Sequence, residues 1–246
     1  MSVISVVLGT LNRLTNIKNL IENTVVQNKF IELVLVDGGS TDGTLEYVKS
    51  LSNKNIKLIE YGKKSSYSHF TNLAIQNSTH EYVCQWDDDA ILLNPWQEIV
   101  NIISHEGKKE DFYIFNWKLA DNIDRKNDKT WLQGNSKEFK WNLHDESSTD
   151  PNGEVIMNYG IYKKKIFREI GMNNTLFDFW YADSDLSNRA YRFGYKHKSL
   201  YDMKVLVLDT EKKREYKNKD LKIYKRNLKK YNKNKLPKGT ALLVDG

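Results

Sequence analysis

The first 90 residues alternate between short apolar runs and segments with apolar positions three or four residues apart. The runs Val3–Leu8 and Ile31–Val36 are rich in β-branched residues, which is typical of strands buried on both faces. Asn16–Gln27 instead has the apolar spacing of a helix. The same criteria predict further strands at residues 56–61 and 81–86 and further helices at residues 45–51 and 69–76. This alternation predicts a parallel sheet with right-handed crossovers.

The second part of the chain is less regular, and its pattern predicts a mixed set of elements. We expect helices at residues 95–105, 164–170 and 183–193, and strands at residues 112–119, 155–162 and 205–208. The polar segment 121–153 is too long for a plain connector, and it contains Trp131 and Trp141. It is therefore a candidate binding loop, in which these two side chains contact a sugar, belong to a lid or simply anchor the segment.

Two polar clusters, Asp37–Thr44 and Asp87–Asp89, directly follow predicted strands. In parallel α/β sheets, ligands bind at the carboxyl ends of the strands, where both clusters are expected to lie. Three adjacent carboxylates repel one another unless a cation or hydrogen-bond donors compensate, and such oxygen ligands suit Mg²⁺ or Mn²⁺. An acidic turn exposed to water is the alternative for Asp87–Asp89. Its place at a strand end, opposite a second polar turn, favours the cation.

Asp37 ends its strand, so its role is expected to differ from that of the turn that follows. Ser40, Thr41 or Asp42 can cap the next helix, which leaves the Asp37 carboxylate unneeded for capping. Such a carboxylate can accept a hydrogen bond from a nucleobase N–H or a ribose hydroxyl. The glycine-rich phosphate-binding patterns of dehydrogenases and P-loop kinases are absent from the sequence, which counts against those classes.

The formal charge of +6 over 246 residues is concentrated in one segment. Residues 211–235 hold twelve Lys and Arg against three acidic residues, so the rest of the chain is mildly acidic at −3. An apolar stripe with helical spacing runs through the segment at Leu221, Tyr224, Leu228 and Tyr231. This basic amphipathic helix either docks on the domain or contacts an anionic membrane or a polyanionic acceptor. No nucleic-acid partner is expected, because the segment has few Arg and few aromatic residues.

The cysteine content and the hydropathy of the chain indicate in which cellular compartment the protein is expected. The single cysteine, Cys84, excludes a disulfide framework and a cysteine-built zinc site, and its predicted strand makes it an inert core residue. No stretch approaches the ~20 consecutive apolar residues that span a bilayer, and the first eight residues are typical of a strand rather than a signal peptide. We therefore expect a cytoplasmic protein, with peripheral contact to the inner membrane face through residues 211–235 as a further hypothesis.

Four segments share a recognisable pattern: Gly9–Arg13, Val34–Thr44, Trp86–Asp89 and Asp183–Arg189. Taken in this order, they resemble motifs of the family 2 glycosyltransferases of the GT-A fold. In that family an N-R pair follows the first strand, a V-D-D-G-S-T-D-G-T run ends the second, and a D-x-D motif follows a later one. An acidic motif, E-D-x-D-L-x-x-R, lies on the acceptor side.

The resemblance implies an architecture for the whole chain. The fold would be α/β, with a GT-A-type, Rossmann-like mixed sheet that is mostly parallel and flanked by helices. A glycosyltransferase domain would occupy residues 1–210, divided into a nucleotide-sugar-binding half (1–92) and an acceptor half (93–210). Residues 211–246 would form a basic, helical C-terminal tail.

The same resemblance implies roles for individual residues. Asp183 occupies the position of the catalytic base, and Asp89 would hold a divalent metal, Mn²⁺ or Mg²⁺, that bridges the donor diphosphate. Support on the acceptor side would come from Asp185, Arg189, Trp180 and Tyr181. The two aromatic rings are candidates for a sugar-stacking platform, with core packing as the alternative. Contacts to the nucleotide-sugar donor would come from Thr10, Asn12, Arg13, Asp37, Asn72, Asp87 and Asp88.

Three departures from the family pattern affect these assignments. Ala182 replaces the usual Glu before the base, which bears on how an acceptor would be positioned. Gly38-Gly39 replaces the common Asp-Gly, which would loosen one nucleotide contact. Many members have a metal-ligating His after the last strand, whereas this chain has Asp209, a candidate oxygen ligand.

The residues and the resemblance together predict an inverting glycosyltransferase. It would move a sugar from a nucleoside diphosphate donor, expected to be UDP-linked, to a hydroxyl of a glycan or a lipid-linked acceptor. A nucleotidyltransferase is the second hypothesis, although the loop after the first strand lacks the Gly-rich, Lys- and Arg-bearing sequence of that class and has only Arg13. A non-enzymatic sugar-binding module is the third.

Overall fold

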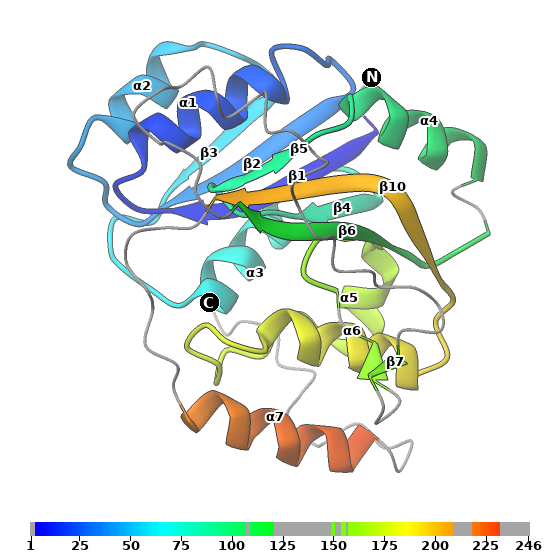
Figure 1. Cartoon of the computed structure of the whole chain (residues 1–246). Helices are drawn as coiled ribbons and strands as arrows, with labels where there is room; N and C mark the ends of the chain where they lie inside the picture. Colours follow the sequence, from blue (N-terminus) through cyan, green and yellow to red (C-terminus); the bar gives the residue numbers. More distant parts are fainter. Residues whose placement is uncertain are drawn as a thin grey trace.

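The protein is represented by a computed structural model that describes residues 3–106, 109–120, 149–150, 154–155, 157–208 and 218–231. Its centre is a curled, eight-stranded sheet with helices on both faces (Figure 1). Parallel and antiparallel pairs both occur in this sheet, and strands from the two halves of the chain lie side by side in it. The predicted mixed, mostly parallel α/β fold is confirmed.

The first half of the sheet is parallel. β1 (Ile4–Thr10) pairs with β2 (Ile31–Asp37) on one side and with β4 (Tyr82–Gln85) on the other, and β2 pairs with β3 (Ile56–Glu60). The crossovers contain α1 (Leu14–Asn23), α2 (Thr44–Ser50) and α3 (Tyr67–Asn77). Each of these elements lies where the apolar pattern predicts it, within a few residues at its ends.

The second half adds strands of both directions. β9 (Gly160–Lys163) is antiparallel to β4 and to β6 (Phe112–Ala120), while β10 (His197–Leu208) is parallel to β6 and antiparallel to β5 (Ala90–Leu92). The sheet order is therefore β3-β2-β1-β4-β9-β6-β10-β5. The helices of this half are α4 (Trp96–Glu106), α5 (Lys164–Ile170), α6 (Ala182–Arg192) and α7 (Asn218–Tyr231).

Two strands differ from their prediction. The predicted strand 155–162 is divided, because β8 (Glu154–Val155) pairs with β7 (Thr149–Asp150) in a separate ribbon and only β9 joins the main sheet. The predicted last strand, 205–208, begins earlier, since β10 pairs with β6 from His197 onward. The pairing shifts register between Leu200 and Lys204, and such an irregularity breaks the alternation by which strands are found in a sequence.

Alternate side chains of the central strands enter two separate cores. Val6 and Leu8 lie in one core cluster and Val7 lies in the other. Helices α1, α2 and α4 cover the first cluster, and α3, α5 and α6 cover the second (Figure 1). Cys84 is buried in the first cluster, where desolvation raises the pKa of its thiol, as expected for an inert core cysteine.

The tail helix α7 lies against α6 at the edge of the molecule (Figure 1). Tyr224 and Tyr231 are buried, and the apolar cluster there joins Tyr224 to Phe177 and Ala182. The apolar stripe of the tail therefore packs on the domain, which is the first of the two alternatives raised by the sequence. Within the described part of the chain, every helix is too short or too polar to cross a bilayer.

Candidate functional site

The acidic turn 87–89 is held in place by backbone hydrogen bonds at both ends. Trp86 N donates to the Val7 carbonyl of β1 (3.0 Å), and the Trp86 indole donates to the Ala90 carbonyl (3.1 Å). At the other end, the N–H of Leu208 donates to the Asp89 carbonyl (2.9 Å). The end of β10 therefore adjoins the turn, and all three Asp side chains of the turn are half-buried.

Hydrogen-bond donors offset the charge of two of these carboxylates. Asp88 accepts a hydrogen bond from the Thr10 hydroxyl (2.8 Å) and lies 3.9 Å from Arg13 Nε. Asp87 accepts a hydrogen bond from the Tyr159 hydroxyl (2.9 Å). The predicted donor residues Thr10, Arg13, Asp87 and Asp88 are thus brought together at the ends of β1 and β4.

Tyr159 is a site residue that the sequence interpretation missed. It is buried next to β9, with its ring edge-on to Trp86 at 5.3 Å between centroids. Desolvation, together with the negative charges of Asp87 and Asp89, raises the pKa of its hydroxyl well above the usual value. A tyrosine just before a strand carries no signal in the sequence, because its partner Asp87 lies 72 positions away.

Asp37 has a structural role that the sequence interpretation did not expect. It is 1% exposed, and its Oδ1 accepts hydrogen bonds from the backbone N–H groups of Gly39 and Ser40, both at 2.9 Å. The Ser40 hydroxyl donates to its Oδ2. Asp42, not Asp37, accepts from Thr44 N at the start of α2, and the hydrogen bonds of Asp37 hold the turn after β2.

The first two motifs are joined by side-chain hydrogen bonds. The Asn12 amide oxygen accepts from Thr41 N (2.7 Å), and Asn12 N donates to the Ser40 hydroxyl (2.9 Å). Asp42 accepts from the backbone N–H groups at the starts of α1 and α2. The loops after β1 and β2 therefore form one rigid edge next to the acidic turn.

A glycine is required where α3 crosses this edge. A Cβ atom at Gly9 would lie 2.4 Å from the Cβ of Phe70, which is far inside van der Waals contact. The ring of Phe70 also lies 2.8 Å from the position of a Cβ at Gly38. The absence of side chains at these two positions lets α3 lie directly against the ends of β1 and β2.

Asn72 lies in the interior rather than at the donor site. Its side chain is fully buried, and its amide donates to the Asn173 carbonyl (2.8 Å) and accepts from Asn173 N (3.0 Å). Both ends of the amide are thus used to join α3 to the segment before α6. This geometry gives Asn72 a structural role, whereas the sequence predicts a contact to the donor.

Asp183 lies in the first turn of α6, close to Tyr181, whose backbone has the left-handed conformation (φ +66°). Its Oδ1 accepts a hydrogen bond from Ser184 N (2.7 Å), and its side chain is partly exposed. Desolvation by the surrounding protein raises the pKa of Asp183 to about 6. A carboxyl group with this pKa is suited to accept a proton near neutral pH.

Tyr67, at the start of α3, interacts electrostatically with both Asp87 and Asp183. Burial raises the pKa of its hydroxyl well above the usual value, and the negative charges of Asp87 and Asp183 raise it further. Its ring lies edge-on to Phe179, 5.8 Å between centroids. Tyr67 also packs in the apolar cluster that contains Ala182, so the start of α3 adjoins the start of α6.

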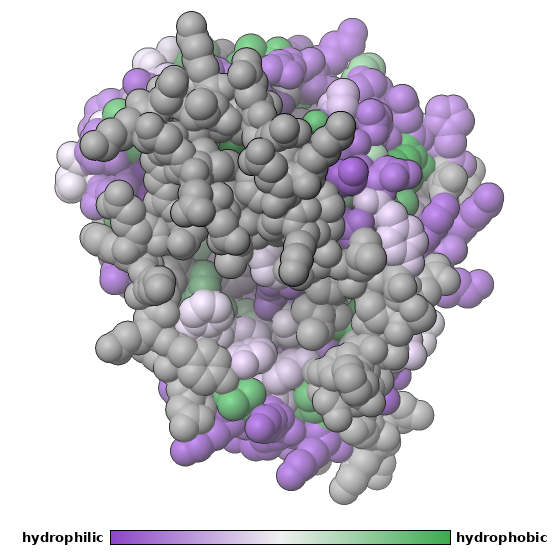
Figure 2. Space-filling view, in the orientation of Figure 1, coloured by the Kyte–Doolittle hydropathy of each residue, from purple (hydrophilic) through white to green (hydrophobic). Residues whose placement is uncertain are grey.

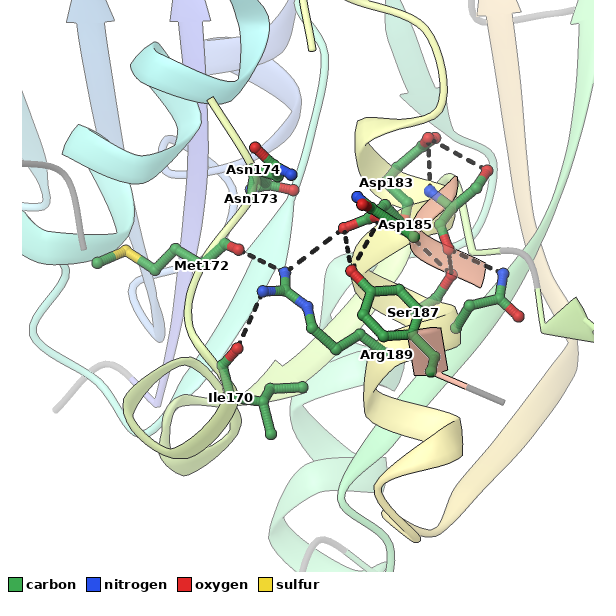
Figure 3. Close-up of polar contacts among 12 residues, drawn as sticks. Ile170, Met172, Asn173, Asn174, Asp183, Asp185, Ser187 and Arg189 are labelled. Carbon is green, nitrogen blue, oxygen red and sulfur yellow. Dashed lines mark hydrogen bonds and ion pairs between the residues drawn. The ribbon is translucent and has the colours of Figure 1, made fainter. Parts of the chain in front are cut away.

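Asp185 and Arg189 are buried beneath Asp183 on the inner side of α6 (Figure 3). Arg189 donates to the carbonyls of Ile170 (2.9 Å) and Met172 (2.5 Å) and lies 3.9 Å from Asp185. Neither side chain is exposed, and both belong to the interior next to Asp183.

The two predicted platform residues differ in their surroundings. Tyr181 stacks on Tyr224 of α7, with 4.9 Å between ring centroids and 16° between ring planes, so one face of its ring is covered by protein. Trp180 is half-buried and lies edge-on to Phe179 at 5.2 Å. The packing alternative therefore holds for one face of Tyr181.

The acidic turn is the part of the described structure that fits a divalent cation. Its donor set is oxygen only, and Mg²⁺ is commonly held by one or two carboxylates together with substrate phosphates. Among the described residues, no group of three or more His, Cys, Asp or Glu side chains is arranged to hold a metal by itself. A site built on Asp89 would therefore be completed by other oxygen ligands, such as water or substrate phosphates. Asp209, Trp131 and Trp141 lie outside the described residues.

Fold and site together define a class: an α/β protein with a mostly parallel sheet whose strand ends carry an acidic turn. The family model for glycosyl transferase family 2 matches residues 5–171. The chain belongs to that family. No curated protein sequence gives a significant match.

Several solved structures share this fold at low sequence identity. A fragment (1-349) of S. aureus TarS in complex with UDP superposes with a TM-score of 0.65 at 19% identity, covering 93% of this chain and 64% of that one. Another S. aureus TarS structure gives 0.62 at 20% identity, covering 85% of this chain and 37% of that one. The mannosyltransferase PcManGT from Pyrobaculum calidifontis, in complex with GDP-Man and Mn²⁺, gives 0.59 at 20% identity, covering 87% and 58%. This chain spans only part of each neighbour, and the likeness confirms the GT-A fold.

Proposed function

We propose that this chain is an inverting glycosyltransferase that moves a sugar from a nucleoside diphosphate donor to a hydroxyl group. The observation that carries the proposal is that α3 lies against the ends of β1 and β2, beside the acidic turn 87–89, while Tyr67 at its start packs in one cluster with Ala182, the residue before Asp183. The reaction needs charge stabilisation at a leaving diphosphate and a base at the attacking hydroxyl. The two acidic groups can supply these functions separately.

The proposed reaction is a single displacement. The acceptor oxygen bonds to the anomeric carbon while the bond from that carbon to the donor phosphate oxygen breaks, and its electron pair leaves with the nucleoside diphosphate. The Asp183 carboxylate takes the proton of the acceptor hydroxyl, and the anomeric configuration inverts. With a pKa of about 6, Asp183 is ionised at neutral pH and is a stronger base than an ordinary aspartate.

Asp89 is proposed to hold a divalent ion, Mn²⁺ or Mg²⁺, with Asp209 as a further candidate ligand. When bound, the ion would supply positive charge to the leaving diphosphate. Thr10, Asn12, Arg13, Asp87 and Asp88 are proposed as donor contacts because they surround the same strand ends. Asp37 is proposed as a nucleobase contact, since a carboxylate has acceptor capacity beyond the three hydrogen bonds it receives within its turn.

A UDP-linked sugar is the proposed donor. TarS fragments have been solved with UDP and with UDP-GlcNAc, which supports this choice of nucleotide. PcManGT with GDP-Man supports a search that includes guanine nucleotides. The proposed acceptor is a glycan or a lipid-linked molecule, and the proposed compartment is the cytoplasm.

The outer side of α7 is proposed to contact an anionic membrane surface through charge alone. Its exposed side chains include Lys222, Lys225, Arg226, Lys229 and Lys230. Figure 2 shows hydrophilic side chains along the lower edge of the molecule, where α7 lies in Figure 1. Because the apolar stripe packs on α6, the helix would rest on lipid head groups without inserting. Binding to anionic vesicles should therefore disappear at high salt.

The test is a thermal-shift screen of nucleotide sugars with Mn²⁺, followed by measurement of nucleoside diphosphate release. A bound donor should raise the melting temperature by mass action, and slow UDP release with water as acceptor should accompany it. Donor binding without any release, with or without candidate acceptors, would favour the non-enzymatic sugar-binding module. Release of pyrophosphate from a nucleoside triphosphate would favour the nucleotidyltransferase.

A further inference from the structure

Asp220, in the first turn of α7, binds the chain segment that leads into α6. Its Oδ1 accepts a hydrogen bond from Asp178 N (3.1 Å), and its Oδ2 accepts from Phe179 N (3.1 Å) and Trp180 N (3.0 Å). The Asp220 carboxylate is completely buried. Hydrogen bonds to an ionised acceptor are stronger than neutral ones, so one side chain of α7 fixes three consecutive backbone groups.

The residue that follows these three is also held by α7. Tyr181 has a left-handed backbone, which is uncommon for a residue with a side chain and persists where surrounding contacts impose it. The parallel stacking of its ring on Tyr224 supplies such a contact. Asp183 is only two residues further along the chain.

Helix α7 also forms hydrogen bonds with a residue that follows Asp183. Asp185 Oδ1 accepts hydrogen bonds from the Asn227 amide (2.8 Å) and from the Tyr231 hydroxyl (3.0 Å), both on α7. All three side chains are buried. The contacts of α7 therefore lie on both sides of Asp183, at residues 178–181 and at residue 185.

We propose that α7 positions Asp183, with Asp220 as the main positioning residue. The proposal rests on the proposed function insofar as Asp183 acts as the base. A catalytic group must be held in a near-attack geometry, and a shift of about 1 Å can reduce a rate about 100-fold. The segment that looks like a basic appendage in the sequence thereby becomes part of the acceptor side of the site.

The test compares Asp220→Asn with the wild-type protein. In the variant, the amide NH₂ replaces one carboxylate oxygen and cannot accept from backbone N–H groups. At least one of the three hydrogen bonds to residues 178–180 is therefore lost. We expect faster hydrogen exchange at the amides of residues 178–180, with UDP affinity in Mn²⁺ within about twofold of wild type and UDP release from UDP-GlcNAc at least about tenfold slower at saturating donor. Asp202→Asn, an exposed carboxylate on β10, is the matched control and should change none of these quantities.

A second variant covers the case in which Asp220→Asn does not fold. Tyr224→Leu keeps an apolar contact but removes the stacking on Tyr181, and it should likewise slow release while leaving UDP affinity unchanged. Unchanged exchange at residues 178–180 in Asp220→Asn, or faster exchange with an unchanged release rate, would overturn the proposal. If wild-type protein binds UDP-GlcNAc but releases no UDP, the proposed function fails, and the exchange measurement still decides whether α7 holds this segment.

Discussion

The two sides of the candidate site are built in different ways. The proposed donor side consists of the ends of β1, β2 and β4, and its polar residues lie in short motifs that directly follow these strands; the proposed acceptor side is the start of α6. The shape of the acceptor side depends on side chains from remote segments. Asp220 and Asp178 are 42 positions apart, and Asn72 and Asn173 are 101 positions apart.

Because of this difference, we expect substitutions on the two sides to have different effects. On the donor side the backbone of the sheet sets the geometry, so a side-chain substitution should remove a contact and leave the frame intact. On the acceptor side the side chains themselves set the geometry, so substitutions away from Asp183 should also change turnover. Donor binding and turnover are therefore expected to respond to different residues.

The largest separation is expected for Asp183→Asn. Loss of the base should reduce transfer or UDP release by about 10²–10⁴-fold, with UDP affinity in Mn²⁺ unchanged by calorimetry. The substitution should not lower stability at pH 7. The raised pKa means that Asp183 favours the folded state fully below the usual value of 3.8, and this contribution is lost as the pH rises through about 6. A joint loss of UDP binding and stability would instead indicate a structural role for Asp183.

Asp89→Asn tests the proposed donor side and, unlike Asp183→Asn, should change the affinity for UDP. Weaker metal binding should reduce the affinity for UDP in Mn²⁺ by about tenfold or more, which corresponds to about 1.4 kcal/mol. Without metal, in EDTA, the variant and the wild type should bind UDP equally weakly. Equal affinities in Mn²⁺ would remove the metal assignment.

The pH dependence should distinguish the two sides in the wild-type protein. The proposed mechanism requires ionised Asp183, so the rate at saturating donor should fall about tenfold per pH unit below about 6 and level off above it. The affinity for UDP should change less over the same range. In Asp183→Asn this inflection of the residual rate should be absent, and its persistence would assign the titration to another group.

The smallest effect is expected for Tyr159→Phe, which removes one hydrogen bond from Asp87. The loss of a hydrogen bond to a charged group should lower the free energy of unfolding by about 1.5–3 kcal/mol. Turnover should fall only a few-fold, because the Asp87 carboxylate remains. Tyr201→Phe, at an exposed tyrosine of β10, is the control, and equal melting curves for the two variants would show that the bond contributes little.

The donor side was largely predictable from sequence because its residues are close together in the chain. The strands up to β4 follow from apolar runs, and Thr10, Arg13, Asp87 and Asp88 meet where adjacent parallel strands end. The exceptions are informative. Asp37 holds its own turn through local hydrogen bonds, and Asn72, which the family motif places at the donor, instead pairs with Asn173, 101 positions away in the sequence.

The acceptor side was predictable only as a list of residues. The family motif located Asp183, Asp185 and Arg189, but their environment comes from α7 and from the segment before α6. The apolar stripe of the tail predicted a helix, and its positive charge suggested a contact with an anionic surface. Asp220 could not be found by pattern, because an aspartate among lysines is typical of a solvated surface helix until its burial is known.

The pairing of Asn72 with Asn173 has one further consequence. Both partners are uncharged amides, and they join α3 to the segment ahead of α6 without any group that titrates or is screened by ions. This joint between α3 and the segment before α6 should therefore keep its geometry from acidic to neutral pH and across a wide range of ionic strength. Changes in rate with pH or salt would then report the chemistry of the carboxylates, with the two halves of the protein acting as a fixed frame.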